Sequence, residues 1–316
     1  MEHAVQARMV YRLIRFAVLL LLVVRPVSAQ QLGQKLLGGI GIDAGTQPMP
    51  GLYVIDRFGY FSSGTVRDQR GDEVPIRGLD IDAYANVFGL SLTVRPRRGP
   101  FLTFGFGAPL AKLSVNSVDP LTSLDRMGMG DVFVQPLKLG WKGRNVDVVA
   151  SYSAYIPTGR FEPRSASGIG RGHWTHEFSI GSAVYLSRDR LTRMSALVSL
   201  DLNTKKRDID IRRGNTVHVQ GGVGVGMPAN VTVGVAGFAL WQVSDDSGAD
   251  IPPTLRGLRT RAFGAGPEID VVIPKLRTRA ELRYETEFGV RSRIDGGVLV
   301  VGIAYQAWRP VQRPRR

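Results

Sequence analysis

The 316-residue sequence contains no cysteine and four histidines. Without cysteine, the chain cannot form disulfides, thiolate-bound zinc sites, iron–sulfur clusters or a cysteine nucleophile. Four histidines leave little material for a His-rich metal site, so neither a metal nor a cofactor is expected. Beyond residue 50 no helical periodicity extends past two turns, which argues against a fold built on helices.

Glycine and short-range alternation are what the sequence has in abundance. It contains 38 glycines, and hydrophobic residues make up 43% of the chain, which is enough to form a folded structure. After residue 50, apolar and polar residues alternate almost everywhere with a period of two. That is the period of a β-strand with one apolar and one polar face, so the sequence predicts an all-β protein.

Residues 1–29 have the parts of a secretory signal peptide. An arginine-containing start precedes the apolar run Phe16–Val24, and a small-residue cleavage pattern ends at Ala29. A membrane-anchoring helix is the weaker alternative, because about 20 apolar residues are needed to span a bilayer and Arg25 ends this run. Residues 30–50 would then form an N-terminal periplasmic segment or a plug.

The chain is strongly basic, with a formal net charge of +14. The predicted signal peptide contains four arginines and one glutamate, so its removal leaves +11. Residues 309–316 form a basic C-terminal tail with four arginines and two prolines. A basic balance can indicate nucleic-acid binding. However, this chain is predicted to be exported and its arginines are scattered through strands, so no nucleic-acid partner is expected, and outer-membrane lipid or a polar pore interior fits better.

Twelve candidate strands fill residues 51–308. Many exceed the usual ~5–6 residues of globular strands and meet the roughly 9–11 residues that a tilted strand needs to cross a bilayer. Their ranges are 51–61, 80–94, 100–113, 129–142, 145–157, 172–186, 191–203, 214–227, 231–243, 257–272, 275–288 and 293–308.

The connections between these strands alternate in length. Those after the first, third, fifth, seventh and ninth strands have ten residues or more, and those after the even-numbered strands are short. The short connection at 289–292 breaks the pattern once. Long loops on one side and tight turns on the other are typical of outer-membrane barrels. The sequence therefore predicts an antiparallel transmembrane β-barrel of about 12 strands, at 51–308, in the bacterial outer membrane.

In the strand at 275–288, the six successive positions of one face from Arg277 to Glu287 are charged, and no position of the other face is. In a barrel this face would line a wet lumen, while in a soluble sandwich it would face bulk water. Glu177, His218 and Gln220 are further candidates for the lumen. The alternative is that they are solvated polar side chains without a specific role. His218 has no second histidine at same-face spacing on its strand, so no metal site is predicted there. The charged candidates on the solute path are Arg277, Arg279, Glu281, Arg283, Glu285 and Glu287.

The middle of the chain resembles a known family. The segment Gly128-Met129-Gly130-Asp131 and the later Pro157-Thr158-Gly159 carry most of the similarity. They resemble the outer-membrane family named for the meta-pathway of phenol degradation, which is usually described as a transporter. The resemblance covers about 115–245 well and implies an outer-membrane barrel linked to aromatic or other hydrophobic compounds. It carries over no active-site motif.

One departure from the barrel pattern lies at the C-terminus. Barrel chains usually stop at a terminal aromatic residue that the barrel assembly machinery reads, whereas here Trp308 is followed by eight residues. The expected partners are thus the barrel assembly machinery, outer-membrane lipid and a small hydrophobic solute.

The pattern and the resemblance together predict a passive channel or transporter for small hydrophobic or aromatic compounds. Two alternatives stay open. One is a plugged structural or interaction barrel that conducts nothing. The other is an outer-membrane hydrolase, which would need a serine beside a histidine. His173 and Ser179 share a face but lie about 20 Å apart along a strand, so Ser153 or Ser195 from another strand would have to serve. The protein is not expected to be an enzyme.

Overall fold

The computed structural model describes residues 40–118, 123–163, 168–253 and 256–310. The predicted signal peptide, residues 30–39 and residues 311–316 of the basic tail lie outside this part of the chain. Among the described residues, no helix combines the length and the apolar character that crossing a bilayer would require.

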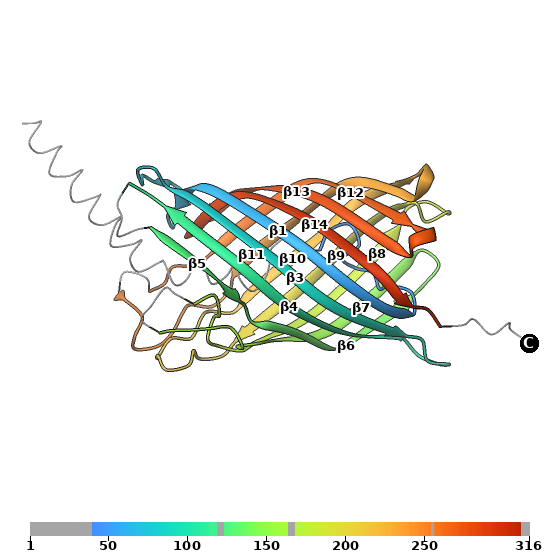
Figure 1. The fold of residues 1–316 in the computed structure, drawn as a ribbon, viewed down its shortest axis with the longest axis horizontal. Helices are drawn as coiled ribbons and strands as arrows, with labels where there is room; N and C mark the ends of the chain where they lie inside the picture. The colour runs from blue at the N-terminus through green and yellow to red at the C-terminus, as the bar shows by residue number, and fades with distance from the viewer. Residues whose placement is uncertain (1–39, 119–122, 164–167, 254–255, 311–316) are drawn as a thin grey trace, which may run out of the picture.

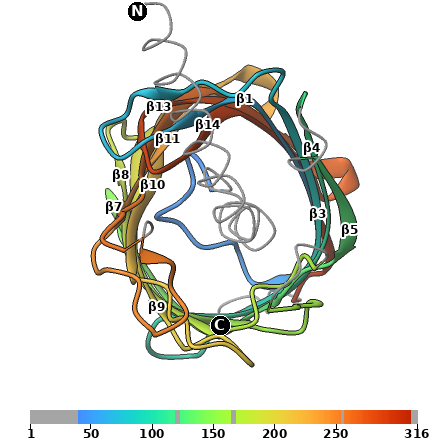
Figure 2. The same ribbon diagram turned by 90° about the vertical axis from the view of Figure 1, so that its left-hand side faces the viewer.

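The described residues contain twelve long antiparallel strands that form a closed barrel (Figures 1 and 2). Each long strand pairs with the one before it along the chain, and β14 returns to pair with β1. This closure leaves the ring of strands without a free edge, as a bilayer demands of a sheet. The strands are β1 (Gly51–Arg67), β3 (Asp80–Val94), β4 (Phe101–Asn116), β6 (Val132–Lys142), β7 (Val146–Ile156), β8 (Thr175–Tyr185), β9 (Thr192–Asn203), β10 (Thr216–Met227), β11 (Val231–Gln242), β12 (Arg261–Ile273), β13 (Thr278–Arg291) and β14 (Arg293–Trp308).

The fold class and the strand number predicted from the sequence are confirmed. The strands expected at 80–94 and 293–308 have those bounds in the structure, and most other bounds differ by one to four residues. Two short strands were not predicted, namely β2 (Glu73–Val74) beside β1 and β5 (Leu124–Met129) beside β4. The first strand also runs six residues beyond its expected end at 61, because it continues to pair with β14 as far as Arg67.

The connections alternate as the sequence predicts. At the short-turn end, 3₁₀ turns at Pro228–Asn230 and Pro274–Leu276 join neighbouring strands. At the opposite, long-loop end, Ser292 alone separates β13 from β14. Because short turns face the periplasm in outer-membrane barrels, the short-turn end is the periplasmic end.

The two faces of β13 show how the barrel wall is built. Arg283 and Glu285 are fully buried inside, whereas Leu282 and Tyr284 are about half exposed, at 48% and 49%. The same alternation leaves large apolar side chains exposed around the outside of the barrel, including Phe88 and Ile180. An apolar outer band and a polar interior are what a membrane barrel requires.

An apolar cluster fills part of the interior near the long-loop end. It is formed by buried side chains of β1, β3, β4 and β14 and of the loop before β3. Partly buried side chains, among them Ile76 and Leu124, pack against it. The cluster consists of Phe61, Val66, Leu79, Ile81, Ala83, Leu113, Val298 and Val300.

Candidate functional site

A cavity of about 1760 Å³ occupies the interior of the barrel. It is lined at the short-turn end by residues such as Pro274 and Trp308, and it extends to Tyr155 and Glu177, which lie near the long-loop ends of β7 and β8. Among the residues that the structure describes, eight cationic side chains line it, against four carboxylates. The cations are Arg57, Arg95, Lys138, Lys142, Arg193, Arg277, Arg279 and Arg309, and the carboxylates are Asp43, Glu177, Glu268 and Glu281.

Residues 40–50 lie inside the ring of strands, where Figure 2 shows them in blue. They are followed directly by β1, so the chain enters the lumen before it starts the wall. Ile42 is fully buried, and Ala44 and Gln47 are nearly so. Residues 40–50 are called the lumen segment below.

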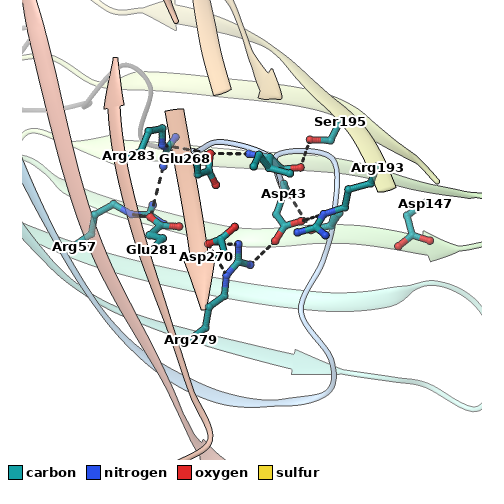
Figure 3. A network of polar contacts seen from close by, with 12 residues as sticks. Asp43, Arg57, Asp147, Arg193, Ser195, Glu268, Asp270, Arg279, Glu281 and Arg283 are labelled. Atoms are coloured by element: carbon teal, nitrogen blue, oxygen red, sulfur yellow. Dashed lines mark hydrogen bonds and ion pairs between the residues drawn. The ribbon is translucent and has the colours of Figure 1, made fainter. Parts of the chain in front are cut away.

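Ion pairs connect the middle of the lumen segment to two separate parts of the wall (Figure 3). The Asp43 carboxylate lies 2.7 Å from Arg193 Nε of β9 and 2.5 Å from Arg279 Nη1 of β13. Arg279 in turn lies 2.8 Å from Asp270 of β12. Burial alone would raise the pKa of Asp43, but Arg279 and Arg193 outweigh burial and hold that pKa below its ordinary value. Asp43 is therefore ionised at neutral pH and bridges two strands that lie far apart in the ring.

Hydrogen bonds fix the backbone on either side of Asp43. The Ile42 amide donates to Glu268 Oε2 at 3.0 Å, and the Ile42 carbonyl accepts from Ser195 Oγ at 2.5 Å. Farther along, Lys138 Nζ donates to the Thr46 carbonyl at 2.8 Å. Several buried backbone groups of the segment are thus paired with the wall, and the Ala44 and Thr46 amides bond within the segment, as burial requires.

Glycine makes the close approach between segment and wall possible. A Cβ on Gly41 would lie 1.6 Å from Glu268 Oε2, and one on Gly224 of β10 would lie 2.7 Å from the Ile42 side chain. Glycine weakens a strand interior and marks places where another backbone comes close. Gly222 and Gly224 of β10, together with Gly234 of β11, therefore leave the space that the Ile42 side chain occupies.

The nine predicted lumen residues divide into two groups. Five of them line the cavity, namely Arg277, Arg279, Glu281, Glu177 and Gln220. Arg277 does so from the turn before β13, where its φ is 52°, rather than from the strand itself. Gln220 Oε1 accepts a hydrogen bond from the Ile40 amide of the lumen segment. A role of these residues on a solute path stays a prediction.

The other four predicted lumen residues are absent from the described lining of the cavity: His218, Arg283, Glu285 and Glu287. Arg283 lies 3.5 Å from Glu268 and 3.6 Å from Glu281. Glu287 pairs with Arg293 at 3.1 Å. They point inward but are packed among other side chains.

The sequence missed several partners because they come from other strands. Asp43, Glu268 and Asp270 complete the ion-pair network of β13, and Asp201 of β9 lies beside His218. Cross-strand register decides these pairs, and register is not readable from one strand. The alternation of β9 and β12 was the one available signal, since it placed Asp201 and Glu268 on inward faces.

The motif segments of the predicted resemblance meet at the long-loop end. Asp131 accepts hydrogen bonds from the Gly159 amide and from the Arg171 amide, each at 3.0 Å. Burial raises the pKa of Asp131 even though these two bonds oppose the rise. The Thr158 hydroxyl accepts from the Val132 amide at 3.0 Å. The Gly-x-Gly-Asp and Pro-Thr-Gly segments thus tie two loops together.

The serines considered for a hydrolase have other partners. Ser195 donates to the lumen segment, and Ser153 accepts from Gln135 Nε2 at 3.1 Å.

Comparison with known proteins agrees with this architecture. The family model described as the MetA-pathway of phenol degradation matches residues 63–301. The chain belongs to this family. Its matched region spans the barrel from the end of β1 to β14 and includes the Asp131 motif. No curated protein sequence matches the chain significantly.

Solved structures also resemble this family member. An outer membrane channel from Pseudomonas putida F1 superposes with a TM-score of 0.73 at 11% identity, over 83% of this chain and 97% of the channel. A Pseudomonas aeruginosa FadL homologue gives a TM-score of 0.41 at 10% identity, over 81% of this chain and 90% of its own. The first of these likenesses supports the outer-membrane β-barrel fold.

Proposed function

We propose that this barrel is a passive outer-membrane channel for small hydrophobic or aromatic compounds, and that the lumen segment is its plug. The cavity of about 1760 Å³ is the observation that carries the proposal. It is large enough for a drug-sized molecule, since ligand pockets measure about 300–1,000 Å³. The family's description, with its reference to phenol degradation, supports aromatic compounds as the solute class.

The contacts of the lumen segment suggest how the channel is closed. Asp43 holds the segment to β9 and β13, and its neighbours bond to β6, β9 and β12. These contacts are few and mainly polar, so water can replace them when the segment leaves. Release of the segment would join the cavity to the rest of the lumen and let solute pass.

Single-channel recording in a planar bilayer tests this function. The full-length mature barrel should show brief openings, and phenol or toluene added to one side should reduce the current by entering the cavity. Liposomes that contain the barrel should also take up a neutral aromatic faster than protein-free liposomes do. Closed recordings together with unchanged uptake would contradict the channel.

The packed long-loop half supports one second candidate, a barrel that conducts nothing and serves a structural or interaction role. Arg283 and Glu285 have no exposed surface in the middle of β13, and the apolar cluster lies toward the long-loop end. This candidate predicts no conductance even after the lumen segment is removed. Deletion of residues 30–50 after the signal peptide therefore separates the two.

A further inference from the structure

The connections at the two ends of the barrel differ in charge. Those at the short-turn end contain eight basic residues and one acidic residue, Asp189. They cover residues 95–100, 143–145, 186–191, 228–230 and 274–277. Those at the long-loop end, with β2 and β5 counted among them, contain thirteen basic and twelve acidic residues. They cover residues 68–79, 117–131, 157–174, 204–215, 243–260 and 292. The excess of positive charge therefore lies almost entirely at the short-turn end.

The eight basic residues of the short turns are called the basic rim below. All of them except Arg190 are exposed. Among the described residues, Arg190 is also the only member of the rim with an ion pair, at 2.8 Å from Asp147. Asp189 accepts hydrogen bonds from Ser187 Oγ and the Leu191 amide within its own turn. The rim consists of Arg95, Arg97, Arg98, Arg144, Arg188, Arg190, Lys275 and Arg277.

The long loops, by contrast, pair their charges with one another. Lys205 Nζ lies 2.9 Å from Asp210, and Arg259 Nε lies 2.7 Å from Asp245. A third pair joins Arg213 to Asp246. The chain thus supplies counter-charges for the loops at one end, and the exposed cations at the other end are available to an anionic partner.

Large apolar side chains are exposed within and beside the basic rim. Leu186 and Leu276 lie in two of its turns and are 62% and 61% exposed. Trp141 and Trp308 are exposed near the ends of β6 and β14. At a membrane interface, phosphate groups lie directly beside acyl chains, and basic and amphipathic aromatic side chains gather there. A soluble acidic protein would match only the charge of this surface, whereas a lipid matches both parts of it.

The position of the rim fits a lipid partner as well. Short turns face the periplasm in outer-membrane barrels, so the rim lies at the level of the periplasmic leaflet. Basic residues next to a membrane are attracted to anionic headgroups, and the attraction falls off within a Debye length, about 8 Å in physiological salt. Exposed cations in the turns are within that distance of the headgroups.

We propose that the basic rim binds the headgroups of anionic phospholipids in the periplasmic leaflet of the outer membrane. A guanidinium can pair with a phosphate through two parallel hydrogen bonds. The proposal sharpens the expectation from the sequence, which named outer-membrane lipid as a partner without a site. It does not depend on whether the barrel conducts, because Arg97, Arg98, Arg144 and Arg188 are absent from the described lining of the cavity.

Electron spin resonance of spin-labelled lipids tests the rim in the full-length mature barrel, reconstituted into phosphatidylcholine vesicles. The fraction of motionally restricted label reports how strongly each lipid associates with the barrel. Phosphatidylglycerol should associate at least about threefold more strongly than phosphatidylcholine. This preference should vanish at about 1 M salt, where the Debye length falls to about 3 Å.

Substitutions at the two ends of the barrel separate the position of the charge from its amount. The rim variant combines Arg97→Gln, Arg98→Gln, Arg144→Gln and Arg188→Gln, and it should lose most of the preference. The matched control removes four exposed arginines from the long loops, so its net charge is the same, and it should keep the preference of the parent. It combines Arg70→Gln, Arg77→Gln, Arg207→Gln and Arg256→Gln. Lysine at the four rim positions should also keep most of the preference.

A heat-modifiable gel band verifies that each variant is folded. If the rim variant is not, Arg97→Gln with Arg98→Gln and Arg144→Gln with Arg188→Gln are measured as two separate proteins, and each should lose part of the preference. Equal association of both lipids with the parent would overturn the proposal and leave an acidic periplasmic protein as the occupant of the rim. A preference that survives in the rim variant, that the control loses equally, or that persists at high salt would overturn it as well.

Discussion

The two halves of the lumen are closed in different ways. The short-turn half contains most of the described lining of the large cavity, with more cations than carboxylates, and the lumen segment, which is not part of the sheet. Toward the long-loop end, the wall itself contributes an apolar cluster and packed inward charges such as Glu285 and Glu287. One half is closed by a separate piece of chain, and the other by its own side chains.

This difference implies that the stability of the barrel and the gating of its lumen depend on different parts of the molecule. Side chains of the wall are fixed when the barrel folds, so opening the long-loop half would cost packing energy. The lumen segment is held by a small number of hydrogen bonds and ion pairs, and its removal leaves every strand pair intact. Single substitutions should therefore open the short-turn half without unfolding the barrel.

The largest effect is expected from Asp43→Asn, which removes the charge between Arg193 and Arg279. Asp43 and its partners are partly buried, and loss of one partner from such a hydrogen-bonded charge pair costs about 2 kcal/mol, which corresponds to a roughly 30-fold rise in the displaced state. The measurement is open probability in a planar bilayer. Asp147→Asn is the control, because Asp147 is also an inward aspartate and pairs instead with Arg190. Equal gating in both variants would show that Asp43 does not hold the plug.

A smaller rise in open probability is expected when a side chain fills the space that Ile42 occupies beside Gly224. In Gly224→Val the new side chain would collide with Ile42, since a Cβ alone would lie 2.7 Å from it. Misfit of this kind costs about 1–3 kcal/mol, so open probability should rise about tenfold. Val225→Leu on the outer face of the same strand is the control. Should Gly224→Val gate like the parent, the Ile42 contact contributes little to closure.

The difference between the two halves also shows what one sequence could predict. Alternation along each strand and the sorting of loop lengths were enough for the twelve strands, because both are local patterns. Local patterns likewise placed the odd-numbered charges of β13 inside. They did not separate Arg279, which lines the cavity, from Glu285, which is packed. That separation depends on what lies across the lumen.

The partners across the lumen come from distant parts of the chain. Asp43 reaches Arg279 over more than two hundred residues, and Asp201 reaches His218 from the neighbouring strand. A residue pattern carries no information about either contact. The glycines of β10 were a visible signal, since they indicated space in the lumen, but the pattern did not identify Ile42 as the side chain that uses it.

Substitution in the long-loop half should change stability more than selectivity. The Glu285 carboxylate is fully buried, and among the described residues neither of its oxygens has a hydrogen-bond partner. A buried charge without such partners is costly, so Glu285→Gln should raise the temperature at which the folded gel band disappears. The strand pattern alone would instead give Glu285 and Glu287 control of anion permeability. Since neither lines the cavity, Glu285→Gln should leave ion selectivity as in the parent, and a clear rise in anion permeability would place Glu285 on the conduit.

The smallest expected effect is a pH response of the loops at the long-loop end. Burial lowers the pKa of Lys206 from its ordinary 10.5 to about 7, and the nearby Arg213 and Arg171 act in the same direction. In the unfolded loop Lys206 keeps its ordinary pKa, so between about pH 7 and pH 10 the unfolded loop binds more protons than the folded one. The stability of the folded loop therefore rises with pH across this window.

Hydrogen exchange of residues 204–214, corrected for intrinsic rates, should slow from pH 6.5 to pH 9. In Lys206→Met this dependence should flatten, whereas exchange in the lumen segment, held by Asp43, should follow the same course in both proteins. If the Lys206→Met barrel kept the full pH response, another titratable group of the loops would be responsible for that response.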